Sequence, residues 1–329
     1  MGRDRLTPWT WHAVVSSWSW RPGWIVVAVL LAAGYALALW WCRRAGRQSV
    51  GLAPAITFFS ALLLLVLTVC SAFDTYSMAL FWVHMIEHLL LIMVVPALLV
   101  LGHPLTLLRN AIGAKAVDRG MSVWPVAVLT HPLVGFVVYA AALVGTHLTH
   151  FMDLMAVHPW MMGAERVLYV VAGYLFLLPL LGNEPIRWRV PLMARLLLIL
   201  VAMGPDTIVG IVLMQSNDPF PVMLAMRPSW APSPAQDVLT GGGIMWVGGD
   251  GLMMVIGLAT IAAILFTRDS DKLLGGWLER TRRSVLAQEL GSGGEPVDSA
   301  MLSETSDVDD DQVVLDAYNR MLSRLKERE

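Results

Sequence analysis

"HMIEHLLLIMVVPALLVL" occupies residues 84–101 and decides the fold, because it joins an ionisable head to a long apolar run. His84 and His88 lie four residues apart, with Glu87 between them. Residues i and i+4 share one face of a helix, so both imidazoles can point into the same helix bundle. Polar groups at membrane depth are costly, and the pair therefore indicates a functional site in a transmembrane helix.

The whole chain shares this apolar character. Of its 329 residues, 57% are hydrophobic and 15% are charged, whereas soluble domains carry about 25% charged residues. Apolar runs of about 20 residues, the length that crosses a bilayer core, recur between short charged segments. We therefore predict an all-α, polytopic membrane bundle. Seven transmembrane helices are expected, at about 24–42, 53–72, 79–101, 124–147, 165–183, 193–215 and 243–267.

Lysine and arginine predict the orientation of these spans. The segments after the first, third and fifth spans are basic, and read "CRRAGRQ", "RNAIGAKAVDRG" and "NEPIRWRVPLMAR". The segments after the second, fourth and sixth spans are nearly free of basic residues, with Arg227 as the main exception. By the positive-inside rule the first set is cytoplasmic, which places the N-terminus outside and the C-terminus inside.

Three regions follow from this topology. Residues 1–23 form an extracytoplasmic segment without the apolar core of a cleavable signal peptide. Residues 24–267 form the seven-helix transmembrane domain, and residues 268–329 form a cytoplasmic tail. Within the tail, "GSGGEPVDSAMLSETSDVDDD" predicts a flexible linker, and "DDQVVLDAYNRMLSRLKERE" predicts a short amphipathic helix.

The predicted topology gathers ligand-type residues on the outer side. Six of the eight histidines fall outside or in the outer leaflet, and only His103 and His131 do not. Imidazoles bind copper and zinc, and thioethers bind Cu(I). The candidate metal ligands are His84, His88, His147 and Met245. The same histidines would also serve as hydrogen-bonded links between helices, and methionine is a common core filler.

Other intramembrane polar residues pose separate questions. Glu87 lies about 100° around the helix from His88 and faces a different neighbour. Asp206 follows Pro205 in the sixth span, where it either orients a histidine or pairs with a polar group on the next helix. Glu165 and Arg166 open the fifth span, and we expect them to form a structural ion pair.

Two longer motifs resemble one known family. "HMIEHLLLIMVVPALLVLGHPLTLLRN" is similar to the histidine-rich third span of the CtaG-type cytochrome c oxidase assembly factors, and "AQDVLTGGGIMWVGGD" is similar to the opening of their last span. The resemblance covers roughly residues 50–267. It implies a seven-span protein of the bacterial plasma membrane that helps copper reach haem–copper oxidases. The positions that match the family are His84, His88, Asp237, Met245, Trp246 and Asp250.

The favoured interpretation is a non-enzymatic assembly factor that holds copper transiently in an outward-facing His/Met pocket and passes it to an oxidase subunit. The expected supporting residues are Glu87, Asp206, Asp237, Trp246 and Asp250. One alternative is a haem-binding electron-transfer protein with His88 and His147 as axial ligands. Another is a proton-coupled transporter that uses His84, Glu87 and Asp206, although the sequence shows no inverted repeat. The sequence contains no hydrolase triad, phosphate loop or nucleic-acid-binding patch, so we expect neither an enzyme nor a nucleic-acid partner.

Overall fold

The computed structural model describes residues 6–10, 12, 16–181, 184–216, 220 and 227–265, and this part of the chain contains helices and no strands. Six of its helices are long and apolar enough to cross a membrane, and a bent helix pair gives a seventh crossing if the pair is counted as one span. The predicted all-α membrane class is therefore confirmed. The predicted tail, residues 268–329, lies outside the described residues.

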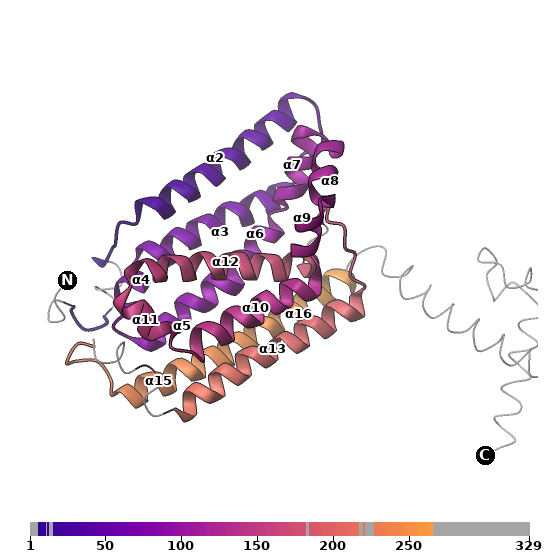
Figure 1. Cartoon of the computed structure of the whole chain (residues 1–329). Coiled ribbons are helices and arrows are strands. Elements are labelled where there is room, and N and C mark those ends of the chain that lie inside the picture. Colours follow the sequence, from indigo (N-terminus) through magenta and orange to yellow (C-terminus); the bar gives the residue numbers. More distant parts are fainter. Residues whose placement is uncertain are drawn as a thin grey trace, which may run out of the picture. The chain divides into compact units, whose positions relative to one another are not determined.

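Successive helices run back and forth along the bundle (Figure 1). Two π-helical segments, η2 and η3, interrupt the third and the last crossing. In chain order the elements are α2 (Pro22–Arg44), α3 (Leu52–Cys70), α4 (Ala72–Ser77), α5 (Phe81–Leu89), η2 (Leu90–Val94), α6 (Val95–Leu101), α7 (Pro104–Ile112), α8 (Ala114–Ser122), α9 (Trp124–Leu129), α10 (Pro132–His147), α11 (Phe151–Val157), α12 (Pro159–Leu181), α13 (Leu192–Gln215), α15 (Pro234–Gly243), η3 (Ile244–Gly248) and α16 (Gly249–Leu265).

The predicted fourth span, residues 124–147, is wrong as one continuous helix. Pro132 opens α10, and the residue before a proline is forced out of the helical region, so His131 is extended and separates α9 from α10. The His131 ring accepts a hydrogen bond from the Leu133 N–H at 3.2 Å and caps the new helix. At its other end α10 is followed by α11 after a bend of 66°.

Two later helices begin well before the predicted residues. α12 begins at Pro159 rather than at 165, and the last crossing begins at Pro234 rather than at 243. The Ser233 hydroxyl accepts a hydrogen bond from the Gln236 N–H and caps the last crossing. The last crossing was placed too late because its first turns contain polar residues such as Asp237, which finds partners inside the bundle.

α12 is the central helix of the bundle and packs against α10, α6 and η2. Two glycines permit this close approach. A Cβ atom on Gly173 would lie 1.9 Å from the Ile92 carbonyl oxygen, and one on Gly135 would lie 2.7 Å from the Leu175 carbonyl oxygen. Small residues at helix contacts let backbones approach each other in membrane bundles. These contacts hold α12 against α10 and against the π-helical segment η2 that directly follows the paired histidines.

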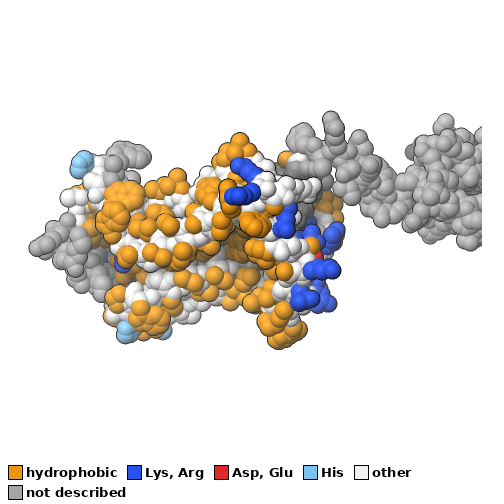
Figure 2. Space-filling view, turned by 90° about the horizontal axis from the view of Figure 1, so that it is seen from above, with side chains coloured by type: hydrophobic (Ala, Val, Ile, Leu, Met, Phe, Trp, Pro, Cys, Tyr) orange, Lys and Arg blue, Asp and Glu red, His pale blue; other side chains and the backbone are white. Residues whose placement is uncertain are grey.

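The basic segments meet at one end of the bundle, and blue side chains gather at that end in Figure 2. Arg47 donates a hydrogen bond to the Ala111 carbonyl at 2.5 Å, which joins the segment after α2 to α7. The Thr106 N–H and hydroxyl both donate to Glu184, which joins α7 to the segment after α12. The three segments predicted to share one side of the membrane therefore do share one end of the molecule.

Candidate metal centre

A cluster of ionisable side chains is buried where α5, α10 and α12 meet. α5 supplies His84 and His88, the end of α10 supplies His147, and the first part of α12 supplies Glu165; each of these residues is at most 2% exposed. The rings of His84 and His88 lie with their centroids 4.0 Å apart. The i and i+4 spacing therefore places both imidazoles on one face, as the sequence predicted.

Three of these residues have the spacing of a metal-ligand set. His84, His88 and Glu165 each offer one atom, and these atoms all lie within 4.8 Å of one another. The distance to Glu165 Oε2 is 3.8 Å from His84 Nε2 and 3.3 Å from His88 Nε2. Two ligands at about 2.1 Å from a tetrahedral ion would lie about 3.4 Å apart. The observed separations therefore fit a single ion between the three side chains.

The ligand atoms of this set lack other partners. Within the part of the chain that the structure describes, neither ring nitrogen of His84 and neither carboxylate oxygen of Glu165 makes a hydrogen bond, and the same holds for His88 Nε2. A buried polar group without a hydrogen bond costs on the order of several kcal/mol in an apolar environment. A bound ion or proton shared by these atoms would offset that cost.

His147 lies behind His88 rather than beside the ion position. Its Nδ1 lies 3.0 Å from the Leu143 carbonyl oxygen and its Nε2 lies 3.1 Å from His88 Nδ1. A carbonyl only accepts, so the hydrogen-bond network assigns the proton of neutral His147 to Nδ1, and its Nε2 accepts from His88 Nδ1–H. His88 Nε2 is then unprotonated and faces Glu165 with its lone pair, which is the form that binds a metal.

Arg166 lies beside this cluster but belongs to a different network. Its Nε is 2.6 Å from Glu87 Oε1, and its Nη2 is 2.5 Å from Asp74 Oδ1. Asp74 also accepts hydrogen bonds from Arg21 and from the Ser19 hydroxyl. The expected ion pair between Glu165 and Arg166 is therefore wrong, because consecutive helical residues point about 100° apart.

Asp237 supports the histidine helix from the neighbouring α15. Its Oδ2 accepts a hydrogen bond from the Phe81 N–H at 2.9 Å, and its Oδ1 accepts one from the Trp82 N–H at 3.1 Å. The first N–H groups of a helix have no partner within the helix, and the helix dipole favours an anion there. This one carboxylate therefore caps α5 and fixes the position of the helix that carries His84 and His88.

The remaining candidates lie on the last crossing and on α13. Met245 is fully buried on η3, which packs against α5 and α13. Trp246 is 37% exposed, and its Cβ packs where a side chain on Gly210 would stand. Asp206 accepts a hydrogen bond from the Tyr139 hydroxyl at 2.7 Å, and Asp250 accepts one from the Thr207 hydroxyl at 2.9 Å. Among the described residues, no hydrogen bond or ion pair joins either aspartate to the histidines.

Reasoning from the sequence missed the roles of Glu165, Tyr169 and Asp74. The Tyr169 ring packs 4.3 Å from the His88 ring, and its hydroxyl lies 2.5 Å from the Thr146 hydroxyl. Glu165 and Tyr169 are spaced i and i+4, as His84 and His88 are, so a shared helix face was readable in "GAERVLYV". Asp74 carried no comparable signal, since it lies in a short segment between two spans.

The fold and this cluster define a polytopic helical membrane protein with a buried histidine–carboxylate site. The sequence model of the family described as cytochrome c oxidase caa3 assembly factor (Caa3_CtaG) matches residues 33–266. The chain therefore belongs to the Caa3_CtaG family, and the predicted resemblance is confirmed. The family description gives assembly of cytochrome c oxidase as the general role of its members.

Curated relatives come from mycobacteria. The chain is 27% identical over 332 residues to "Uncharacterized protein Mb0105" of Mycobacterium bovis, covering 97% of this chain and 45% of that protein. It is 26% identical over 311 residues to "Uncharacterized protein ML1998" of Mycobacterium leprae, covering 91% of this chain and 43% of that protein. The chain thus spans less than half the length of these relatives. No solved structure matches it.

Proposed function

We propose that this chain assists the assembly of a haem–copper oxidase by holding a copper ion between His84, His88 and Glu165. The ion is cargo, to be passed to an oxidase subunit at the membrane. The observation that carries the proposal is the set of buried ligand atoms on α5 and α12 that face one another without hydrogen bonds. The family description supplies the process, and the cluster supplies a chemistry suited to it.

The donor set favours a borderline ion over a soft one. Two imidazoles and one carboxylate suit Cu(II), Zn(II) or Fe(II), whereas Cu(I) prefers thiolates and thioethers. Met245, buried on η3 against α5, is the candidate thioether for a reduced ion. Three protein ligands leave a coordination position open, and a ligand from the client protein needs such a position to take the ion.

Glu165 is the third ligand in this proposal, whereas His147 was the third ligand expected from the sequence. The His147 nitrogens face the Leu143 carbonyl and His88, so its contribution is to orient the His88 ring. Metal-binding histidines generally donate their second N–H to such a partner, which fixes the tautomer and the ring orientation. We therefore assign His147 a positioning role.

The two alternatives fit the geometry less well. Axial haem ligation by His88 and His147 requires the two rings on opposite sides of an iron, yet these rings contact each other directly. A proton relay through His84, Glu87 and Asp206 requires the three groups to communicate. Glu87 is instead bound to Arg166, and Asp206 is bound to Tyr139.

We place the copper site on the extracytoplasmic side, because the opposite end carries the basic segments. Cysteine at Ser229 should react with an impermeant maleimide in intact cells, whereas cysteine at the exposed Ser122 should react only after permeabilisation. The natural Cys42 and Cys70 are buried and contribute little background. The reverse labelling pattern would show that the site opens to the cytoplasm.

Metal analysis of the detergent-purified full chain tests the copper proposal. After loading with copper and washing, the natural protein should retain about one ion per chain. Glu165→Gln, which keeps the side-chain shape, and His84→Ala should each lower copper affinity by more than about tenfold, since each removes a ligand. The double variant should lose little more than the weaker single variant, because the ligands act as a unit.

His150→Ala is the matched control, because His150 is an exposed histidine outside the cluster. It should leave copper retention unchanged. Retention of copper by Glu165→Gln and His84→Ala would refute the site, and preferential retention of zinc would refute copper as the cargo while leaving the ligand set intact.

A further inference from the structure

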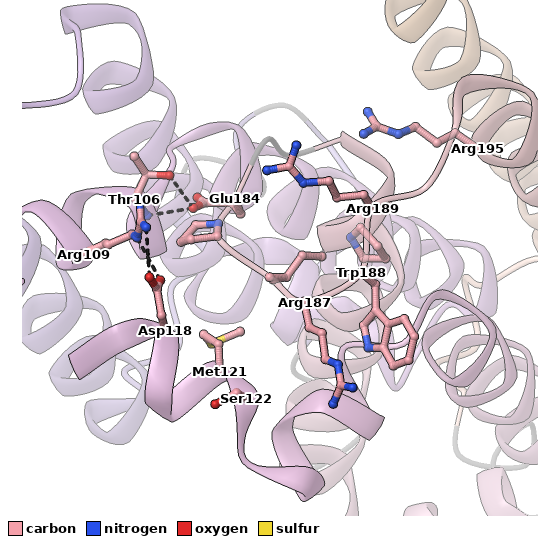
Figure 3. Close-up of a pocket in the computed structure, with 13 residues that line it drawn as sticks. Thr106, Arg109, Asp118, Met121, Ser122, Glu184, Arg187, Trp188, Arg189 and Arg195 are labelled. Atoms are coloured by element: carbon pink, nitrogen blue, oxygen red, sulfur yellow. Dashed lines mark hydrogen bonds and ion pairs between the residues drawn. The ribbon is translucent and has the colours of Figure 1, made fainter. Parts of the chain in front are cut away.

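A second polar site lies at the basic end of the bundle, far along the helices from the histidine cluster. It is a pocket of about 630 Å³. Its walls come from α7, α8, the segment between α12 and α13, and the first turn of α13 (Figure 3). Small-molecule sites in proteins have volumes of about 300–1,000 Å³. The pocket is therefore large enough for a ligand of several functional groups.

The walls of this pocket are anchored by hydrogen bonds. The Thr106 N–H and hydroxyl donate to Glu184 Oε2 at 2.7 and 2.8 Å. The Trp188 indole N–H donates to the Ala127 carbonyl at 2.6 Å, and Arg195 Nε donates to the Val190 carbonyl at 2.9 Å. The segment that carries the arginines is thus tied to α7, α9 and α13. A ligand would meet side chains on a fixed backbone, which lowers the entropy cost of binding.

The charge of the lining is unbalanced. Arg109 is neutralised by Asp118 through two hydrogen bonds of 2.8 and 2.9 Å. The guanidinium of Arg187 lies over the Trp188 ring, 5.5 Å from its centroid. Arg189 makes no hydrogen bond or ion pair with any residue that the structure describes.

Arg195 donates only to backbone carbonyls in the same part of the chain, at Val190 and Leu180. Arg187, Arg189 and Arg195 therefore carry three positive charges without carboxylate partners among the described residues. Glu184, the buried carboxylate of the lining, is bound by Thr106 through Oε2, and its Oε1 lies 3.7 Å from His103 Nδ1. Figure 3 shows Arg189 and Arg195 extending in the same direction, whereas Arg187 points away from them, and Arg109 and Asp118 are paired on the facing wall.

We propose that this pocket binds a phosphate group, held by Arg189 and Arg195, with the positive charge of Arg187 in the same lining. The planar guanidinium presents paired N–H donors that match phosphate oxygens, and several arginines on one ligand give charge-assisted hydrogen bonds. The pocket opens at the ends of membrane-crossing helices, next to Trp188, where lipid headgroups and indole rings are found together. Basic pockets between helices at the cytoplasmic surface are suited to anionic headgroups. Either an anionic phospholipid or a free phosphate compound supplies this chemistry.

Native mass spectrometry of the detergent-purified full chain tests the proposal. Delipidated protein is exposed to phosphatidylglycerol or to phosphatidylcholine, and the retained lipid is counted. The natural protein should retain phosphatidylglycerol preferentially. The double variant Arg187→Gln/Arg189→Gln should bind it roughly 20-fold more weakly, because each basic residue near an anionic headgroup changes binding about fivefold. Arg189→Lys, which keeps the charge and loses the paired donors, should bind with intermediate affinity.

Arg43→Gln/Arg44→Gln is the matched control, since it removes the same charge at the same end of the protein but outside the pocket. It should bind phosphatidylglycerol as the natural protein does. Pyrophosphate at millimolar concentration distinguishes the two sources: displacement of the lipid, with binding to lipid-free protein, assigns a free phosphate compound, and no displacement assigns the lipid headgroup. Equal losses in both double variants, or equal retention of the two lipids, would overturn the proposal.

Discussion

Glu165 and Arg166 are consecutive residues of α12, yet they enter two buried polar clusters of opposite character. Glu165 faces His84 and His88, where the ligand atoms have no hydrogen bonds within the described residues. Arg166 faces Glu87 and Asp74, at ion-pair distances of 2.6 and 2.5 Å. Buried charge alone therefore does not identify a binding site. Paired charges hold helices together, whereas facing ligand atoms without hydrogen bonds are suited to binding an ion.

The largest expected effect comes from the paired cluster. Arg166→Met would leave Glu87 buried without its ion-pair partner and would remove one of the partners of Asp74, which we expect to lower the free energy of unfolding by about 3–5 kcal/mol. Thermal unfolding in detergent measures this loss. Arg109→Met is the control, because it removes an arginine from an exposed ion pair with Asp118 and should change stability little. A stable Arg166→Met variant would show that the paired charges of this cluster do not stabilise the fold.

A smaller effect is expected at His147, and it should change copper affinity rather than the free energy of unfolding. His147→Leu removes the acceptor for His88 Nδ1–H and should weaken copper binding about 10–100-fold. His147→Gln offers an amide oxygen to the same N–H and should restore part of the affinity. Copper titration of the purified variants measures both, with the exposed His158→Leu as control. Complete loss in His147→Leu without recovery in His147→Gln would make His147 a ligand, as the sequence first suggested.

The smallest effect is expected at Asp237, because this carboxylate caps α5, the helix that supplies residues to both clusters. Asp237→Ala removes the carboxylate that caps α5 and should lower the free energy of unfolding by about 1 kcal/mol. Asp237→Asn keeps an oxygen acceptor and serves as the matched control, with a smaller loss in the same unfolding measurement. A loss as large as that of Arg166→Met would mean that Asp237 holds the bundle together rather than one helix end.

Local patterns predicted most of the fold. The same-face arrangement of His84 and His88 follows from helix periodicity, which needs no partner. Helix periodicity could not predict which side chains Glu165 meets, because that depends on how α12 is rotated against α5. The break before Pro132 was readable from the proline, but the apolar run on both sides concealed it.

The start at Pro234 was concealed in a similar way. The serine–proline start signal was present in the sequence, but the polar residues that follow lowered the hydropathy of the first turns. Asp237 therefore fell before the predicted span, whereas it lies within α15. Hydropathy marks where a helix meets lipid, and it cannot mark a turn whose polar groups are satisfied by neighbouring helices.

The π-helical segment η2 bears on how this site can change over evolutionary time. A π-turn holds one residue more than an α-turn, so it offsets the helix faces on its two sides by about 100°. Before η2, the face of α5 carries His84 and His88; within η2 and just after it, Ile92 and Pro96 pack against Gly173. Deletion of a single codon between 90 and 94 would merge the two faces into one continuous helix. We expect such a deletion to force a choice between the histidine–carboxylate cluster and the central helix contact, whereas the π-turn lets the two faces be selected separately.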